Sequence, residues 1–148
     1  MYLFFGYNIT GRLYYFLLCY FCIVENSKKY IYPKKEKLKS HTTIQLLFSE
    51  GKSVSKYPLR LVYLPLTDNN AVLQTGVSVS KRYFKLAHDR NYFKRVLRET
   101  YRHNRHILTD ALGQPYAFML FYQSKDRLSY QEINTKTIQL FEKFVAQI

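Results

Sequence analysis

The stretch Asp89–Arg105, Asp-Arg-Asn-Tyr-Phe-Lys-Arg-Val-Leu-Arg-Glu-Thr-Tyr-Arg-His-Asn-Arg, has the spacing of an amphipathic helix. At 3.6 residues per turn, four polar and basic side chains form one row along this helix: Asn91, Arg95, Arg98 and Arg102. Three further cations flank the row: Arg90, Lys94 and Arg105. A different face carries Phe93, Val96, Leu97 and Thr100. We therefore expect a helix that buries one side, has Asp89 as its N-cap and directs guanidinium groups outward.

The basic row differs from an ordinary solvated helix face in two respects. Stabilising surface helices usually mix acids with bases at i,i+4, whereas Glu99 is the only acid between Arg90 and Arg105. The bases are mostly Arg, whose planar guanidinium can contact phosphate through two hydrogen bonds and stack on nucleotide bases. A solvated face is the commoner origin of a charge run, but these two features favour a surface that binds nucleic acid.

The net charge of the chain is concentrated around this helix. The 148 residues include 23 Lys and Arg and 10 Asp and Glu, which gives a formal net charge of +13. Between Lys81 and His106 there are nine basic and two acidic side chains, so +7 of this charge lies in 26 residues. Excess charge localised in this way steers a polyanion to one face of a protein.

Residues 1–33 differ in composition from the rest of the chain. The apolar run Leu13–Val24 is 12 residues long, shorter than the roughly 20 residues of a membrane-spanning helix. No small-residue cleavage site follows it, and Cys19 and Cys22 have no second pair or histidine cluster that would indicate a zinc or redox site. We expect an atypical apolar extension, either a mis-assigned start or a disordered or loosely packed segment, before a domain at 34–148. The protein is expected to be cytoplasmic, without stable membrane association.

The remaining pattern predicts short helices and strands. A first helix follows the Thr42–Gln45 capping box and ends near Gly51, and a last helix opens at the Ser129–Glu132 capping box. Three segments have the composition of strands: 57–66, 72–80 and 116–123. The first two are expected to pair antiparallel across the polar turn between them. The third is almost continuously apolar, which is typical of a central strand.

Three spaced motifs resemble the protein subunits of bacterial ribonuclease P. The Arg-Asn-Arg signature of that family, followed by Lys-Arg and Arg-Glu, corresponds to Arg90–Glu99. The strand before the signature is similar to Gly76–Arg82, and Lys37–Ser53 resembles the first helix of the family. The match runs from Lys34 to about Phe144, and the combination of three motifs is far more specific than any one of them.

The resemblance implies a fold that the order of elements alone does not determine. It implies an α+β two-layer sandwich in which a mostly antiparallel four-stranded sheet carries helices in the order αβββαβα. A left-handed βαβ crossover runs through the signature helix, whereas composition alone favours the common right-handed connection. The chain departs from the family pattern at Tyr92, which replaces the second signature Arg, and at Ile44, which replaces an aromatic residue.

Few side chains are suited to hydrolysing a phosphodiester without help. Such chemistry needs paired carboxylates that hold divalent metals, or a His-based acid/base pair, and the acids of this chain are scattered. His103 and His106 lie one helical turn apart, but so basic a helix repels a cation, so we expect exposed or stacking histidines. The resemblance implies that the catalytic RNA of ribonuclease P holds the active site and Mg²⁺, and that the protein alone is inactive.

The resemblance also implies two RNA-binding surfaces. Contacts to the catalytic RNA are expected from Lys81, Arg82, Arg90, Asn91, Lys94, Arg95, Arg98 and Arg102. The 5′ leader of precursor tRNA is expected in a cleft between the first helix and the concave sheet face, at Lys37, Phe48, Lys52 and Tyr63. The aromatic residues would stack on unpaired bases and the lysines would contact the backbone, although Phe48 and Tyr63 are as well suited to core packing. The alternative function is that of a general RNA-binding or ribosome-associated protein without a role in cleavage.

Overall fold

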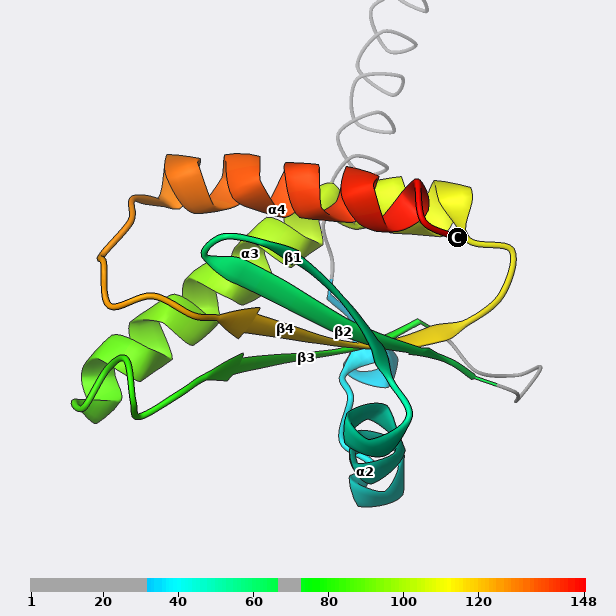
Figure 1. Ribbon diagram of the computed structural model, residues 1–148, viewed down its shortest axis with the longest axis horizontal. Coiled ribbons are helices and arrows are strands. Elements are labelled where there is room, and N and C mark those ends of the chain that lie inside the picture. Colours follow the sequence, from blue (N-terminus) through cyan, green and yellow to red (C-terminus); the bar gives the residue numbers. More distant parts are fainter. Residues whose placement is uncertain (1–31, 67–72) are drawn as a thin grey trace, which may run out of the picture. The chain divides into compact units, whose positions relative to one another are not determined.

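Four strands form one mixed sheet in the order β1-β2-β4-β3 (Figure 1) in the computed structural model of the chain, which describes residues 32–66 and 73–148. The strands are β1 (Lys52–Lys56), β2 (Leu59–Pro65), β3 (Gln74–Val79) and β4 (Tyr116–Tyr122). Strand β2 pairs antiparallel with β1 and β4, and β3 pairs in parallel with β4. The helical elements are the short η1 (Lys34–Glu36), α2 (His41–Ser49), α3 (Ala87–Ala111) and α4 (Tyr130–Val145). The α+β class and the order of elements expected from the resemblance are confirmed.

Strand β4 lies between β2 and β3, so the predicted pairing of segments 57–66 and 72–80 is wrong. Every residue of β4 is buried except Phe121, which is half-buried. A strand that is apolar on both faces buries most surface at the centre of a sheet, and this position separates β2 from β3. The polar turn predicted at 68–70 lies outside the described residues.

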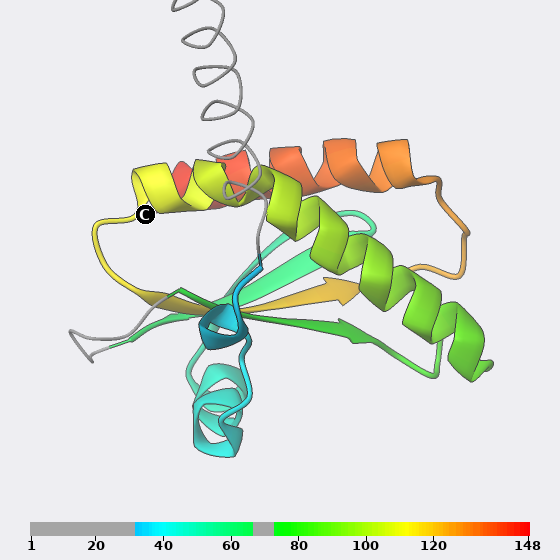
Figure 2. The ribbon, with the colours of Figure 1, turned by 180° about the vertical axis from the view of Figure 1, so that it is seen from behind.

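The connection from β3 through α3 to β4 is left-handed, as the resemblance implies. In Figure 2 helix α3 lies in front of the sheet, both strands point to the right and β4 lies above β3. When the strands are turned to point upward, the chain therefore crosses from right to left in front of the sheet. Connections of this hand are rare between parallel strands.

Helices cover both faces of the sheet, with α3 and α4 on one face and α2 on the other (Figure 1). Alternation along β2 places Leu59, Leu61 and Tyr63 in the larger core, which includes α3 and α4. A smaller core on the opposite face consists of Leu47, Val62, Ala117 and Met119. The sheet therefore has one face that two helices cover and one that α2 covers only in part.

The ends of the helices agree with the predicted signals in most respects. Helix α2 has Ser40 rather than Thr42 as its capping side chain. It ends before Gly51, where a Cβ atom would lie 2.1 Å from the backbone oxygen of Leu47, so the close approach of the chain requires glycine. The predicted Ser129–Glu132 capping box of α4 is confirmed.

The described unit begins at Tyr32, two residues before the predicted boundary at Lys34. The Tyr32 hydroxyl donates a hydrogen bond to the backbone oxygen of Thr75 in β3. Its ring meets Tyr101 of α3 edge-on, with ring centroids 5.3 Å apart. The predicted apolar extension and both cysteines lie outside the described residues. None of the helices in the described part of the chain has the length and apolar composition needed to cross a membrane.

Candidate nucleic-acid interface

Helix α3 packs against the sheet and α4 through the face that the sequence predicts. The buried side chains include the four predicted ones, Phe93, Val96, Leu97 and Thr100, together with Tyr101, Asn104 and Leu108. The ring of Phe93 stacks on the rings of Phe84 and Tyr122, at centroid distances of 4.4 and 4.7 Å. Asn104 Nδ2 donates to Asn134 Oδ1 of α4 at 2.7 Å. These contacts fix the rotation of α3 about its axis and thereby decide which side chains face outward.

Helix α3 lies in front of the sheet in Figure 2, and the predicted row is on its outward side, opposite to the buried residues. Asn91, Arg95 and Arg98 are exposed, and Lys94 on the flank is half-buried. Within residues 32–66 and 73–148, no hydrogen bond or ion pair involves the side chain of any of these four. Their polar groups are therefore available to a ligand.

Two arginines on the flank of the row make contacts within the protein instead. Arg90 Nη1 donates to the backbone oxygens of Phe84 at 3.0 Å and Lys85 at 2.6 Å, and so fixes the turn before α3. Arg105 Nη2 lies 2.9 Å from Oε1 of the buried Glu36. Burial raises the pKa of Glu36, and the charge of Arg105 opposes this shift. The structure therefore gives Arg90 and Arg105 an internal role that the sequence row does not distinguish from phosphate binding.

Asp89 anchors the first turn of α3 from a buried position. It is 6% exposed, and its Oδ1 lies 2.5 Å from Arg127 Nη2 and 3.1 Å from His88 Nε2. The predicted N-cap role is wrong, because Leu86 occupies the N-cap position and has no side-chain hydrogen bond there. A carboxylate in the first turn still interacts favourably with the helix dipole, and the pair with Arg127 joins α3 to the connection between β4 and α4.

Glu99 contacts two bases on the same helix. Its Oε1 accepts a hydrogen bond from Arg102 Nη2 and lies 3.0 Å from His103 Nε2. Tyr130 of α4 is close by: burial raises its pKa, Glu99 adds to the rise and Arg102 opposes it. His106 Nδ1 lies 3.1 Å from the backbone oxygen of His103. The two histidine rings therefore contact different partners, Glu99 and a backbone oxygen.

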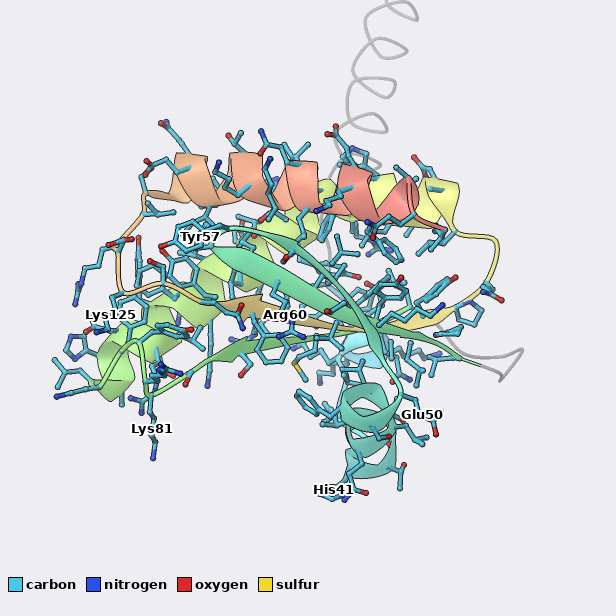
Figure 3. The ribbon with its side chains drawn as sticks, viewed as in Figure 1. His41, Glu50, Tyr57, Arg60, Lys81 and Lys125 are labelled. Carbon is cyan, nitrogen blue, oxygen red and sulfur yellow. The ribbon has the colours of Figure 1, made fainter. Side chains whose placement is uncertain are left out.

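Lys81 and Arg82 extend the basic surface at the turn between β3 and α3. Both side chains are exposed, and Figure 3 shows Lys81 at the end of the sheet where α3 begins. Tyr92, which replaces the second Arg of the signature, is 53% exposed and meets the ring of Phe93 edge-on at 5.2 Å. Its ring is therefore available to stack on a ligand.

The four residues predicted to bind the leader do not lie in a single cleft. Phe48 on α2 is 59% exposed, and its ring meets the edge of Phe121 at 6.0 Å. Lys52 begins β1 at one edge of the sheet, whereas Lys37 forms an isolated bridge to Thr75 of β3 at the other edge. The prediction placed them together because it had no strand order.

Tyr63 is buried, so the prediction that its ring stacks on the leader is wrong. It is 8% exposed, and its ring packs against Phe144 of α4 at 4.6 Å and Tyr116 at 6.3 Å. The physical reason is alternation, because Tyr63 shares the buried face of β2 with Leu61. Lys52 is the cross-strand partner of Tyr63. Its side chain is therefore on the face opposite to α2 and Phe48.

Two residues on the α2 side of the sheet were missed by the sequence reasoning. Arg60 of β2 is exposed, and its Nη2 donates to Ser53 Oγ at 3.2 Å. Its register partner on β4 is Phe121, which contacts Phe48. We refer to Phe48, Phe121 and Arg60 as the aromatic-basic group. The sequence pattern of β2 could have indicated Arg60, which is the only charged residue of this strand and alternates with the buried Leu59 and Leu61.

The acids near α3 do not fit a site for Mg²⁺. In the described part of the chain, no three His, Cys, Asp or Glu side chains are placed to share a metal ion. Glu36, Asp89 and Glu99 each pair with an arginine. A Mg²⁺ site uses carboxylate oxygens that are free to face the ion, so this donor set is unsuited to one.

These features define a class of protein. A small α+β domain with a row of outward guanidinium groups on one helix, and exposed basic and aromatic side chains on a partly open sheet face, is suited to binding nucleic acid.

The comparisons with known proteins define this class further. The family model for ribonuclease P matches residues 32–145. The chain therefore belongs to the ribonuclease P protein family, whose members are the protein subunits of the enzyme that processes the 5′ ends of tRNA. The ribonuclease P protein component of Porphyromonas gingivalis is 41% identical over 98 residues, 64% of this chain and 72% of that protein. That of Blochmanniella pennsylvanica is 32% identical over 114 residues, 77% of each chain.

Solved structures of the same family share the fold. The Staphylococcus aureus RNase P protein superposes with a TM-score of 0.60 at 16% identity, over 74% of this chain and 94% of that one. The Thermotoga maritima RNase P protein gives a TM-score of 0.59 at 20% identity, over 73% and 96%. The four-stranded mixed sheet with its helices is thus confirmed as the fold of this family.

Proposed function

We propose that the outward side of α3 docks on the catalytic RNA of ribonuclease P. The observation that carries this proposal is the row of Asn91, Arg95 and Arg98, which are exposed and unpaired within the described residues. Surface cations without internal partners contribute little to the stability of the protein, whereas they are well suited to neutralising phosphates. Lys81 and Arg82 continue this surface beyond the start of α3.

The unpaired 5′ leader of precursor tRNA binds, in this proposal, to the aromatic-basic group on the α2 side of the sheet. Phe48 offers an exposed ring for a base to stack on, and Arg60, the cross-strand partner of Phe121, supplies a cation on the same face of the sheet. Stacking accepts any base, which suits leaders of varied sequence. Lys37, at the β3 edge of the sheet, would contact the backbone of the leader outside this group. The side chain of Lys52 lies on the opposite face of the sheet and is not part of this proposed surface.

Cleavage of the phosphodiester is assigned to the RNA partner and to Mg²⁺ held mainly by that RNA. The protein has few acids to contribute, because Glu36, Asp89 and Glu99 are each paired with an arginine. Its own residues would hold the catalytic RNA and the substrate in position, and so lower the Mg²⁺ concentration that the reaction requires. We infer that the protein alone does not cut RNA, and that it acts in the cytoplasm.

A cleavage assay tests this assignment directly. The full chain, the ribonuclease P RNA of the same organism and their mixture are each incubated with a 5′-extended precursor tRNA at low Mg²⁺. Efficient cutting at the mature 5′ end by the mixture alone is the expected result. A protein that adds nothing to the RNA would reduce the proposal to general RNA binding, and a protein that cuts unaided would overturn the assignment of the catalytic groups.

A precursor without its leader separates the two proposed surfaces. Phe48→Ala should weaken binding of the leader-bearing precursor to the holoenzyme and leave binding of leaderless tRNA unchanged. Arg95→Ala should instead weaken assembly of the protein with the catalytic RNA. If Phe48→Ala affects both substrates equally, the leader is not bound by the aromatic-basic group.

A further inference from the structure

Glu99 occupies a position where a negative charge opposes the function of its helix. It is the only acid between Arg90 and Arg105, and its side chain is 42% exposed on a surface that should meet a polyanion. General electrostatics predicts that its charge lowers affinity for RNA. A specific contact that offsets this repulsion would explain an acid at this place.

The contact is with Arg102, the last member of the outward row. Arg102 Nη2 donates to Glu99 Oε1, and the Nε atom of Arg102 is buried without a hydrogen-bond partner among the described residues. The carboxylate therefore holds one terminal nitrogen, while the Arg102 side chain stays 36% exposed. A guanidinium carries five N–H donors in one plane, so restraining one nitrogen restricts the directions in which the others can point.

His103 contacts the same carboxylate oxygen. Its Nε2 lies 3.0 Å from Glu99 Oε1. Glu99 is therefore restrained by two neighbours on its own helix and is itself suited to restrain Arg102.

We propose that Glu99 is a positioning residue that pre-orients the Arg102 guanidinium for contact with a phosphate of the catalytic RNA. The inference rests on the proposed docking of α3 on that RNA and adds a role for an acid within it. An arginine that is ordered before binding loses less side-chain freedom on binding, which is worth about a two- to tenfold gain in affinity.

The sign of the effect of removing Glu99 distinguishes this role from a plain charge effect. If Glu99 acts only through its charge, Glu99→Gln removes a repulsive group and strengthens RNA binding. If Glu99 orients Arg102, Glu99→Gln weakens binding by about two- to tenfold, although the protein has become more positive.

The experiment is a double-mutant cycle on binding of the full chain to the ribonuclease P RNA. Wild type, Glu99→Gln, Arg102→Ala and the double variant are compared, with Glu99→Asp as a conservative rescue and Asp110→Asn as a matched control. The control removes one negative charge near the end of the same helix, where Asp110 accepts a hydrogen bond from Thr109. Melting curves of each variant separate RNA affinity from folding.

The expected result is a loss of affinity in Glu99→Gln that disappears when Arg102 is already Ala. Asp110→Asn should bind as wild type or slightly more tightly. A gain of affinity in Glu99→Gln would overturn the proposal, whatever the double variant shows. If the gain persists in the Arg102→Ala background, Glu99 acts by charge alone, and if it disappears, Glu99 withholds Arg102 from the RNA.

Arg95→Ala in the same series distinguishes failure of this inference from failure of the proposed function. If Arg95→Ala binds as wild type, α3 does not dock on this RNA and both ideas fall. If Arg95→Ala binds more weakly but Glu99→Gln binds more tightly, α3 docks as proposed and only the positioning role is lost.

Discussion

Replacing Arg95 or Arg98 with Ala should weaken binding to the catalytic RNA and reduce its dependence on salt. Both side chains are exposed on the outward row of α3, and neither has a hydrogen bond or an ion pair in the described residues. Each phosphate contact that is lost lowers the log-log slope of affinity against salt by about 0.7–0.9. When salt is raised from about 50 to about 200 mM, the affinity of the variant should therefore fall about threefold less than the affinity of wild type.

The same variants should leave the stability of the protein almost unchanged. Neither guanidinium makes a hydrogen bond or an ion pair within the described residues, so the free energy of unfolding should change by less than about 0.5 kcal/mol. Arg90→Ala is expected to differ, because Arg90 donates to two backbone oxygens before α3. Loss of hydrogen bonds from a charged group should lower the free energy of unfolding by about 1.5–3 kcal/mol.

Affinity for the RNA at four or five salt concentrations, together with urea denaturation, checks both expectations. Lys136→Ala serves as a control for the loss of one positive charge, because Lys136 is on α4 and not on α3. It lies seven residues before Lys143, whose Nζ donates to the backbone oxygen of Ser55 in β1, at the edge of the sheet opposite to β3. Unchanged affinity and slope in both Arg95→Ala and Arg98→Ala would refute the assignment of the α3 surface. An equal change in the control would show that net charge alone matters.

Three further changes test the core, the sheet faces and a buried acid. Leu97→Ala should lower the free energy of unfolding by about 2–5 kcal/mol in urea denaturation, because Leu97 is fully buried; a smaller loss would mean that α3 packs more loosely than described. Tyr63→Ala should cost about 3–5 kcal/mol of stability, whereas Phe48→Ala should cost little and remove about 1–3 kcal/mol of leader binding; a stable Tyr63→Ala protein with impaired leader binding would restore Tyr63 to the leader site. Because burial raises the pKa of Glu36 above its ordinary 4.5, the folded chain holds this proton more tightly than the unfolded chain does. The contribution of Glu36 to stability is therefore complete below pH 4.5 and is lost as the pH rises through the folded-state pKa. The free energy of unfolding should be measured for wild type and Glu36→Gln across this pH range. Relative to wild type, Glu36→Gln should be more stable at neutral pH than at acid pH. The opposite trend would mean that pairing with Arg105 outweighs burial.

Helix α3 was predictable because all the relevant information is local. A periodic pattern over 17 residues from Asp89 to Arg105 specifies both a buried and an exposed side, and the structure buries Phe93, Val96 and Leu97 as expected. Packing on α4 and the sheet selects this rotation and leaves Arg95 and Arg98 outward. The central part of the candidate site could therefore be predicted from sequence alone.

The strand order and the division of the arginines were not predictable in the same way. Placing β4 between β2 and β3 depends on contacts between residues more than 35 positions apart, such as Gln74 and Ala117, and the local turn signal favoured a hairpin. Arg105 meets Glu36, which lies 69 positions earlier in the chain, so a local pattern could not reveal this pair. The burial of Tyr63, by contrast, follows from alternation with Leu59 and Leu61 and could have been predicted.

The central place of β4 also affects how the protein is made. On the ribosome β2 and β3 are synthesised before β4, yet each of them finds its inner neighbour only in β4. A nascent chain that ends before Tyr116 therefore has two unpaired strand edges, which are the sites where chains associate wrongly. The four-stranded sheet can be completed only after the whole of α3, with its row of cations, has been synthesised. Newly synthesised protein is thus expected to need protection from aggregation until Tyr122 has left the ribosome.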